Sequence, residues 1–173
     1  MVRTRWSTAG IFLLVICGSD VSAQQIPGCT SAVVTDPPRT VFRCNGGLII
    51  EVEAFAAFRI SSSRSGGPTS IELMSRAILI EFTRPRRFQI LTPHAIASVR
   101  GTIYAVDVAP AQTSVFVARG RTRVTRRDRS EAVNLGRGEG VDVAQGVPLV
   151  VRRWSLERAS ALLGRFGRQH LAR

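Results

Sequence analysis

The fold of this chain is decided by an alternating stretch, LIIEVEAFAAFRI, at residues 48–60. Every second position of the stretch is apolar, and these positions are Leu48, Ile50, Val52, Ala54, Ala56, Phe58 and Ile60. Successive side chains of a β-strand point to opposite faces, so this period predicts strand structure with one buried and one solvated face. Glu51 and Glu53 fall on the solvated face, and we interpret them as surface carboxylates rather than as a catalytic pair.

Further strand candidates follow, separated by turn residues. At residues 71–82 the run Ala77-Ile78-Leu79-Ile80 is continuously apolar, which is typical of a strand buried on both faces. Shorter β-branched segments recur at intervals of roughly ten residues, at 87–91, 97–108, 114–118, 121–125, 132–135, 141–144 and 149–152. No helical period interrupts residues 40–152, so alternating β-α units are not expected. The pattern predicts an all-β domain at residues 48–152, built as a sandwich, barrel or solenoid.

One amphipathic helix is predicted at the C-terminal end, within residues 153–173. From Ser155 as the N-cap to about His170, the apolar side chains lie on one side of the helical wheel. The opposite side carries Arg158, Arg165 and Arg168. We expect this helix to pack on the β domain with its arginines in water. Attachment to an anionic membrane surface is the alternative.

The first 23 residues have the layout of a secretory signal peptide. Arg3 and Arg5 precede an apolar run at residues 11–17, and the segment ends in Val21-Ser22-Ala23. The run is shorter than the roughly 20 apolar residues that span a bilayer, so a transmembrane anchor is not expected. We predict cleavage before Gln24 and a periplasmic or secreted mature protein.

Two cysteines, Cys29 and Cys44, remain after such cleavage. Thiols oxidise in exported proteins, so we predict a disulfide that ties down an N-terminal arm at residues 24–47. Two buried free thiols are the alternative, and a zinc site is not expected because no histidine or third cysteine lies nearby. Pro27-Gly28 and Pro37-Pro38 are turn signals, so we expect the arm to be irregular up to residue 39.

The charge is strongly positive and is carried by arginine alone. The chain has 24 basic and 12 acidic residues, a net charge of +12, and the printed sequence contains no lysine, which excludes lysine nucleophiles. The densest cluster consists of Arg119, Arg121, Arg123, Arg126, Arg127 and Arg129. Export and the lack of interleaved aromatic residues argue against nucleic acid. A merely solvated surface is the favoured interpretation of this cluster. If the cluster binds, an envelope protein or an anionic envelope polymer is the expected partner.

The inventory of catalytic groups is sparse, and we predict no catalytic residue, metal site or cofactor. His94 follows a proline in a predicted turn, and no serine or aspartate lies at a spacing that suggests a triad. Gly136-Arg137-Gly138-Glu139-Gly140 looks like a phosphate-binding loop, but strand-like residues follow it where such a loop requires a helix. We interpret this segment as a β-turn.

Three segments resemble the FecR domain. Residues 88–108, FQILTPHAIASVRGTIYAVDV, contain its Thr-Pro pair and its Val-Arg-Gly-Thr signature, at Thr92, Pro93, Val99, Arg100, Gly101 and Thr102. Residues 113–120 are similar to the strand of that family that ends in a glycine turn, here Gly120, and residues 133–141 are similar to its turn with Gly138 and Glu139. The resemblance implies an all-β, solenoid-like or sandwich-like extracytoplasmic domain in which these residues are fold signatures.

The resemblance also implies a role in the cell envelope. Members of the FecR family are best known for relaying a signal from an outer-membrane receptor to an extracytoplasmic-function sigma factor. Those members carry a cytoplasmic anti-sigma segment and a membrane helix, neither of which we expect here. We predict a non-enzymatic sensing or protein-binding module that presents strand edges or its arginine-rich face. An envelope structural protein that binds lipopolysaccharide or peptidoglycan through arginines is the alternative.

Overall fold

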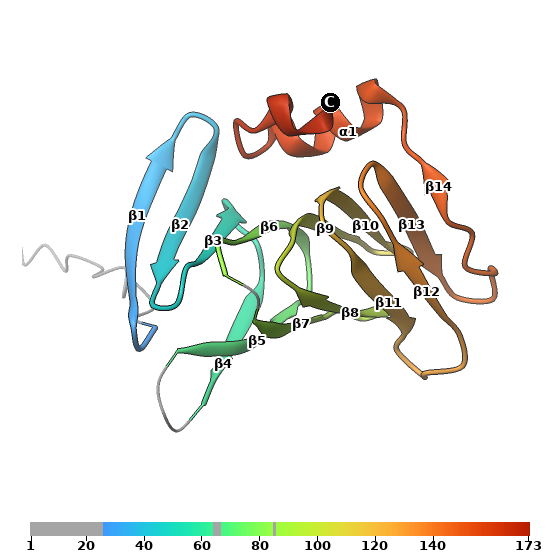
Figure 1. Ribbon diagram of the computed structural model, residues 1–173, viewed down its shortest axis with the longest axis horizontal. Helices are drawn as coiled ribbons and strands as arrows, with labels where there is room; N and C mark the ends of the chain where they lie inside the picture. Colours follow the sequence, from blue (N-terminus) through green and yellow to red (C-terminus); the bar gives the residue numbers. More distant parts are fainter. Residues whose placement is uncertain (1–25, 64–66, 85) are drawn as a thin grey trace, which may run out of the picture.

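The computed structural model describes residues 26–63, 67–84 and 86–173, which form two β-sheets and a C-terminal helical segment (Figure 1). The predicted signal peptide lies outside the described residues. Both sheets contribute side chains to one core between them, among them Ile50 and Ile78 from one sheet and Phe88 and Ile90 from the other. The predicted all-β, sandwich-like class with a C-terminal helix is confirmed. No helix in the described part of the chain has the length and apolar character needed to cross a membrane.

The eight-stranded sheet has the order β1-β2-β3-β6-β9-β10-β13-β14, and its pairings are antiparallel. Its strands are β1 (Cys29–Thr35), β2 (Pro38–Cys44), β3 (Leu48–Glu53), β6 (Arg76–Phe82), β9 (Ile103–Ala109), β10 (Gln112–Arg119), β13 (Glu139–Ala144) and β14 (Arg152–Arg153).

The six-stranded sheet has the order β12-β11-β8-β7-β5-β4 and is antiparallel except between β5 and β7. Its strands are β4 (Phe58–Ser62), β5 (Pro68–Leu73), β7 (Arg87–Leu91), β8 (Ala95–Arg100), β11 (Thr122–Arg126) and β12 (Ala132–Leu135).

The alternating stretch at residues 48–60 forms two strands rather than one. β3 ends at Glu53 and β4 begins at Phe58, and between them lies a turn in which Phe55 has a φ of 61°. The two strands belong to different sheets. The apolar period continues through the turn because both strands direct their alternate residues into the same core. Residues 71–82 and 97–108 are divided in the same way, each by a short corner that leads from one sheet to the other.

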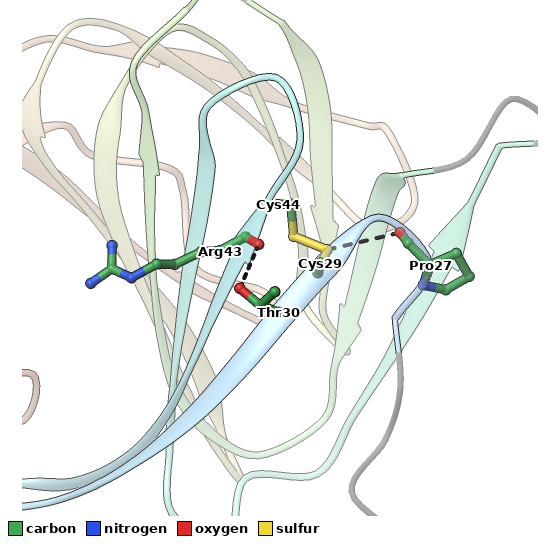
Figure 2. The surroundings of a disulfide bond; sticks show 5 residues. All are labelled: Pro27, Cys29, Thr30, Arg43 and Cys44. Atoms are coloured by element: carbon green, nitrogen blue, oxygen red, sulfur yellow. Dashed lines mark hydrogen bonds between the residues drawn. A yellow bond between two sulfur atoms is a disulfide. The ribbon is translucent and has the colours of Figure 1, made fainter.

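The N-terminal arm is not irregular, and this expectation was wrong. β1 and β2 form an antiparallel hairpin that extends the eight-stranded sheet. Pro37 lies in the hairpin turn and Pro38 is the first residue of β2, positions where a strand tolerates proline. The predicted disulfide is confirmed, because Cys29 and Cys44 are bonded and lie directly opposite each other in the hairpin (Figure 2).

The C-terminal segment forms α1 (Leu156–Gly164) and a 3-10 turn, η1 (Gln169–Ala172), so the α-helix is shorter than predicted. Ser155 is its N-cap, since the hydroxyl accepts a hydrogen bond from the backbone N–H of Arg158 at 3.2 Å. Figure 1 shows this segment over β6, β9 and β10 of the eight-stranded sheet. Its apolar face packs there against Leu79, Ala105 and Phe116. Because that face is covered by the sheet, the membrane-surface alternative is wrong.

The arginines of this segment are not simply in water, contrary to expectation. Glu51 is only 4% exposed, and its carboxylate accepts hydrogen bonds from Arg39 Nε at 2.8 Å and Arg168 Nη1 at 3.2 Å. Arg165 pairs with Glu53, and also with Asp107 at 2.9 Å. The interpretation of Glu51 and Glu53 as solvated carboxylates is therefore wrong. The helical segment covers the outer face of β3, and buried charges persist when they are paired.

A second contact fixes the beginning of α1. Arg158 Nη2 donates to Asp142 Oδ1 at 2.6 Å, and its guanidinium lies 3.7 Å from the centre of the Trp154 ring. Trp154 in turn stacks on Phe116, with 5.1 Å between ring centres. Burial acts to raise the pKa of Asp142, but hydrogen bonds from Arg158 and Ser114 outweigh it and hold this pKa below its ordinary value.

Replacing Glu51 by glutamine tests the buried pairs. The change Glu51→Gln leaves Arg39 and Arg168 facing a neutral amide, so we expect the free energy of unfolding to fall by about 3 kcal/mol in urea denaturation. The matched control is Glu72→Gln, which breaks an exposed pair with Arg59 at 3.5 Å and should cost less than about 1 kcal/mol. Equal losses for the two variants would contradict the structural role of Glu51.

Acid should weaken the attachment of α1 through Asp142. A carboxylate whose pKa is lowered by folding stabilises the protein above its unfolded value of about 3.9, and this contribution disappears as the pH falls through the folded value. We expect Asp142→Asn to be less stable than the parent protein at neutral pH and to approach it in strong acid. Denaturation at a series of pH values measures this difference, and a constant difference across the series would refute it.

Candidate functional site

A groove of about 1220 Å³ lies along the six-stranded sheet. This volume exceeds the range of roughly 300–1,000 Å³ that is usual for small-molecule pockets. Polar side chains of β7, β8, β11 and β12 and of the residue before β11 line the groove. We call this surface the polar groove, and define it by Arg87, Gln89, Ser98, Arg121, Arg123 and Asn134.

Strand register places polar side chains of the groove in one row. Gln89 lies opposite Ser98, Ser98 opposite Arg123, and Arg123 opposite Asn134. The pairings of β7 with β5 and of β5 with β4 extend the row to Ser70 and Ser61. Adjacent strands are about 4.8 Å apart, so polar groups cross the whole sheet at this spacing.

The row faces outward because its neighbours along each strand face the core. Phe88, Val99, Val124 and Leu135 are each at most 6% exposed and fill the interior. Since side chains alternate along a strand, the residues between them point away from the core. Gln89 Nε2 donates a hydrogen bond to Ser98 Oγ at 3.2 Å.

The groove carries positive charge that the described residues do not neutralise. Arg87, Arg121 and Arg123 form no ion pair within the described part of the chain. Among the described residues that line the groove, Glu139 is the only carboxylate, and its Oε2 accepts a hydrogen bond from the N–H of Gly136 at 2.7 Å. Arginine stays protonated at any physiological pH, so the groove attracts anionic ligands.

Two corners of the chain hold Arg121 at the groove. One leads from β8 to β9 through Gly101 and Thr102, and the other leads from β10 to β11 through Gly120. The buried Thr102 hydroxyl donates to the carbonyl oxygen of Arg121 at 3.2 Å. Gly120 has a φ of 90°, and a Cβ there would lie 2.9 Å from Thr102 Cγ2. The corners therefore pack directly on each other.

Other signature residues also build turns. Thr92 precedes Pro93 in the turn between β7 and β8, and its buried hydroxyl accepts hydrogen bonds from Ala95 N at 2.8 Å and Thr113 Oγ1 at 2.9 Å. His94 Nδ1 lies 3.1 Å from the same Thr113 hydroxyl. Gly138, with a φ of 77°, ends the turn between β12 and β13, and Glu139 is the first residue of β13. Val99 fills the core, whereas the side chain of Arg100 lies outside the described part of the structure.

These turns fall mostly within a segment that matches a known family. The family model described as FecR protein matches residues 32–123, which is more than half of the chain. The chain belongs to the FecR family. The part of this FecR protein that matches runs from β1 into β11 and includes both corners around Arg121. It ends before Asn134 and before α1, which lie outside the family match.

Solved structures share the fold of this FecR protein. Two crystal structures of a "putative anti-sigma factor" from Parabacteroides distasonis ATCC 8503 match it with a TM-score of 0.61 each, at 16% and 15% sequence identity. Each match covers 78% of this chain and 64% of that chain, so the FecR protein spans somewhat less than two thirds of these neighbours. At this identity the likeness establishes the fold alone. No curated protein matches the chain.

The arginine cluster expected from the sequence of this FecR protein is divided by the fold. Arg121 and Arg123 line the polar groove, whereas Arg127 and Arg129 lie at the turn between β11 and β12. Arg119 is exposed at the end of β10, in the other sheet. Arg126 is the sixth member of the predicted cluster. The six arginines therefore do not form one surface.

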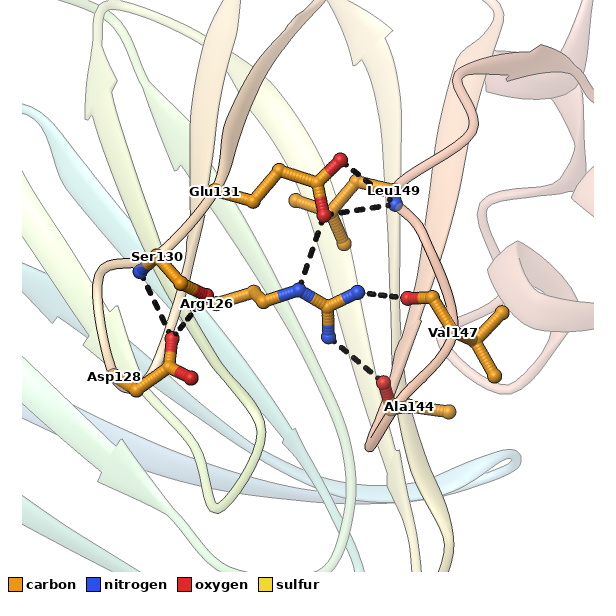
Figure 3. Close-up of polar contacts among 7 residues, drawn as sticks. All are labelled: Arg126, Asp128, Ser130, Glu131, Ala144, Val147 and Leu149. Atoms are coloured by element: carbon orange, nitrogen blue, oxygen red, sulfur yellow. Dashed lines mark hydrogen bonds and ion pairs between the residues drawn. The ribbon is translucent and has the colours of Figure 1, made fainter.

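Arg126 in particular is a structural residue, with only 13% of its side chain exposed. Its Nε donates to Glu131 Oε2 at 3.1 Å, and its other nitrogens donate to the carbonyl oxygens of Ala144 and Val147 (Figure 3). Glu131 also accepts from Leu149 N at 3.1 Å. Arg126 thus joins the hairpin of β11 and β12 to the loop that follows β13 in the other sheet.

Sequence reasoning missed Arg87, Gln89, Ser98 and Asn134 as members of one site. Each lies between two core residues, or beside one, in a segment correctly predicted as a strand. That alternation could have identified them as outward-facing, but strand order was needed to bring them together. The described residues contain no group of three or more histidine, cysteine, aspartate or glutamate side chains that could hold a metal ion.

Replacing Gly120 by alanine tests the packing of the two corners. Gly120→Ala adds a methyl group that collides with Thr102 at a positive φ, and we expect a loss of at least about 2 kcal/mol in the free energy of unfolding. The control is Gly146→Ala, because Gly146 has a φ of 72° but nothing within 4 Å of the added Cβ. It isolates the backbone strain, which should cost about 1 kcal/mol. Equal losses would show that the corners do not pack as described.

Proposed function

We propose that this FecR-family protein is an exported, non-enzymatic sensing module that binds a protein partner in envelope signalling. Family membership and the fold shared with anti-sigma factor structures support a signalling or sensing role. The observation that carries the proposal is the polar groove, in which guanidinium, amide and hydroxyl groups face outward on a regular sheet. Such groups recognise ligands through hydrogen bonds and charge.

Export is part of this proposal. The signal-peptide layout of residues 1–23 supports it. The Cys29–Cys44 disulfide also supports it, because disulfides persist mainly in oxidising compartments. We place the protein in the periplasm or outside the cell, where an envelope protein can reach the groove. We propose a sensing role for this chain. The description as an anti-sigma factor applies to the solved neighbours.

A second candidate surface for partner binding is the edge of the eight-stranded sheet, where a partner could add a strand. β1 is an edge strand whose seven residues carry no charge, and Val33 on it is 79% exposed. An extended segment of a partner could pair with this edge through backbone hydrogen bonds. The groove is favoured because its unpaired arginines add charge selectivity, which backbone hydrogen bonds at an uncharged edge do not supply.

Site-specific crosslinking in cells tests the proposal. A photoreactive amino acid at Gln89, in the groove, should capture a protein partner that mass spectrometry identifies. The control position is Arg43, which is exposed on β2 of the other sheet and should capture none. We expect the mature N-terminus recovered from the same preparation to be Gln24. Capture from Val33 but not from Gln89 would move the partner to the edge of β1, and capture from neither would refute the proposal.

A further inference from the structure

We propose that the ligand of the polar groove is an acidic peptide segment in extended conformation, with carboxylates on alternate residues. The inference rests on the proposed function and names the chemistry that the partner presents. Three features of the groove support it: the unpaired arginines, the spacing of Arg121 and Arg123, and the chemistry of the neighbouring side chains.

The groove arginines differ from the arginines that hold the fold together. Arg39, Arg126, Arg158, Arg165 and Arg168 all pair with carboxylates of this chain, at the helical segment or at the hairpin of β11 and β12. The groove arginines have no such partner among the described residues. A guanidinium binds a carboxylate through two parallel hydrogen bonds when geometry allows. The groove arginines therefore lack an acidic partner, which a ligand can supply.

The spacing of Arg121 and Arg123 matches an extended peptide. These residues flank Thr122, which is 2% exposed and points into the core, so both side chains point to the outer face. Residues two positions apart on a strand are separated by about 6.6 Å. A peptide that lies along β11 in extended conformation repeats its side chains with the same period. Carboxylates at its positions i and i+2 can therefore meet Arg121 and Arg123 together.

The neighbouring side chains suit a peptide backbone. The amides of Gln89 and Asn134 each offer donors and an acceptor, and the Ser98 hydroxyl offers both. An extended peptide outside a sheet has free backbone N–H and C=O groups, and these side chains can form hydrogen bonds with both. A sugar polymer would favour exposed aromatic rings for stacking, but Phe88, the one aromatic residue among the described residues that line the groove, is 1% exposed. The observations therefore favour a peptide over a polysaccharide.

The test compares two labelled octapeptides of identical composition. In one, glutamate and threonine alternate. In the other, two glutamates alternate with two threonines, so that no two glutamates are two positions apart. Binding to the mature protein is followed by fluorescence anisotropy. We expect tighter binding of the alternating peptide, and weaker binding as salt is raised.

Two double variants locate the binding. Arg121→Gln with Arg123→Gln removes two charges from the groove, and we expect the dissociation constant to rise about fivefold for each guanidinium lost. Arg43→Gln with Arg129→Gln removes the same charge from exposed positions that do not line the groove, and should leave the dissociation constant unchanged. Thermal unfolding of both variants verifies that they fold.

The inference is overturned if the two peptides bind equally well, if both double variants weaken binding to the same extent, or if polygalacturonate displaces the alternating peptide more effectively than unlabelled peptide does. Crosslinking separates these results from the proposed function. A protein captured from Gln89, together with no preference for alternating carboxylates, would leave the proposed function intact and remove the peptide inference. Selective peptide binding without any captured protein would support the peptide inference and refute the proposed function.

Discussion

Burial of the eight-stranded sheet on both faces is the constraint on which the structure depends. One face packs against the other sheet, and α1 with η1 covers part of the opposite face. Glu51 and Glu53 lie beneath this cover, so they require cationic partners, which Arg39, Arg165 and Arg168 supply. The six-stranded sheet has no comparable helical cover among the described residues. Its outer face consequently keeps polar groups available, and there the arginines remain unpaired.

Much of the fold could be predicted from the sequence, because the apolar period reports which side chains face the core. The strands at residues 87–91 and 132–135 were predicted with their observed bounds, and Ser155 was identified as the N-cap of α1. The corner at residues 54–57 was missed because the period continues through it. The period also cannot report what covers the other face of a strand, which is why Glu51 was interpreted as solvated.

The candidate site was harder to predict than the fold. Arg121 and Arg123 belong to the cluster that the sequence suggested, but nearness along a chain does not determine nearness in a sheet. Arg126 lies only three residues beyond Arg123 and is nevertheless a partly buried bridge between the two sheets. Gln89, Ser98 and Asn134 come from three strands whose order follows from tertiary pairing. Local patterns carry no information about that order.

The anchoring of β11 has a consequence for the energetics of recognition. One end of the strand is fixed by the hydrogen bond from Thr102 to the Arg121 carbonyl, and the other end by the Arg126 network. A receptor strand that is immobile before the encounter loses little conformational entropy when a ligand arrives. Such preorganisation raises the affinity for a ligand that fits the groove, and selectivity then arises from side-chain complementarity and not from folding of the receptor around its ligand.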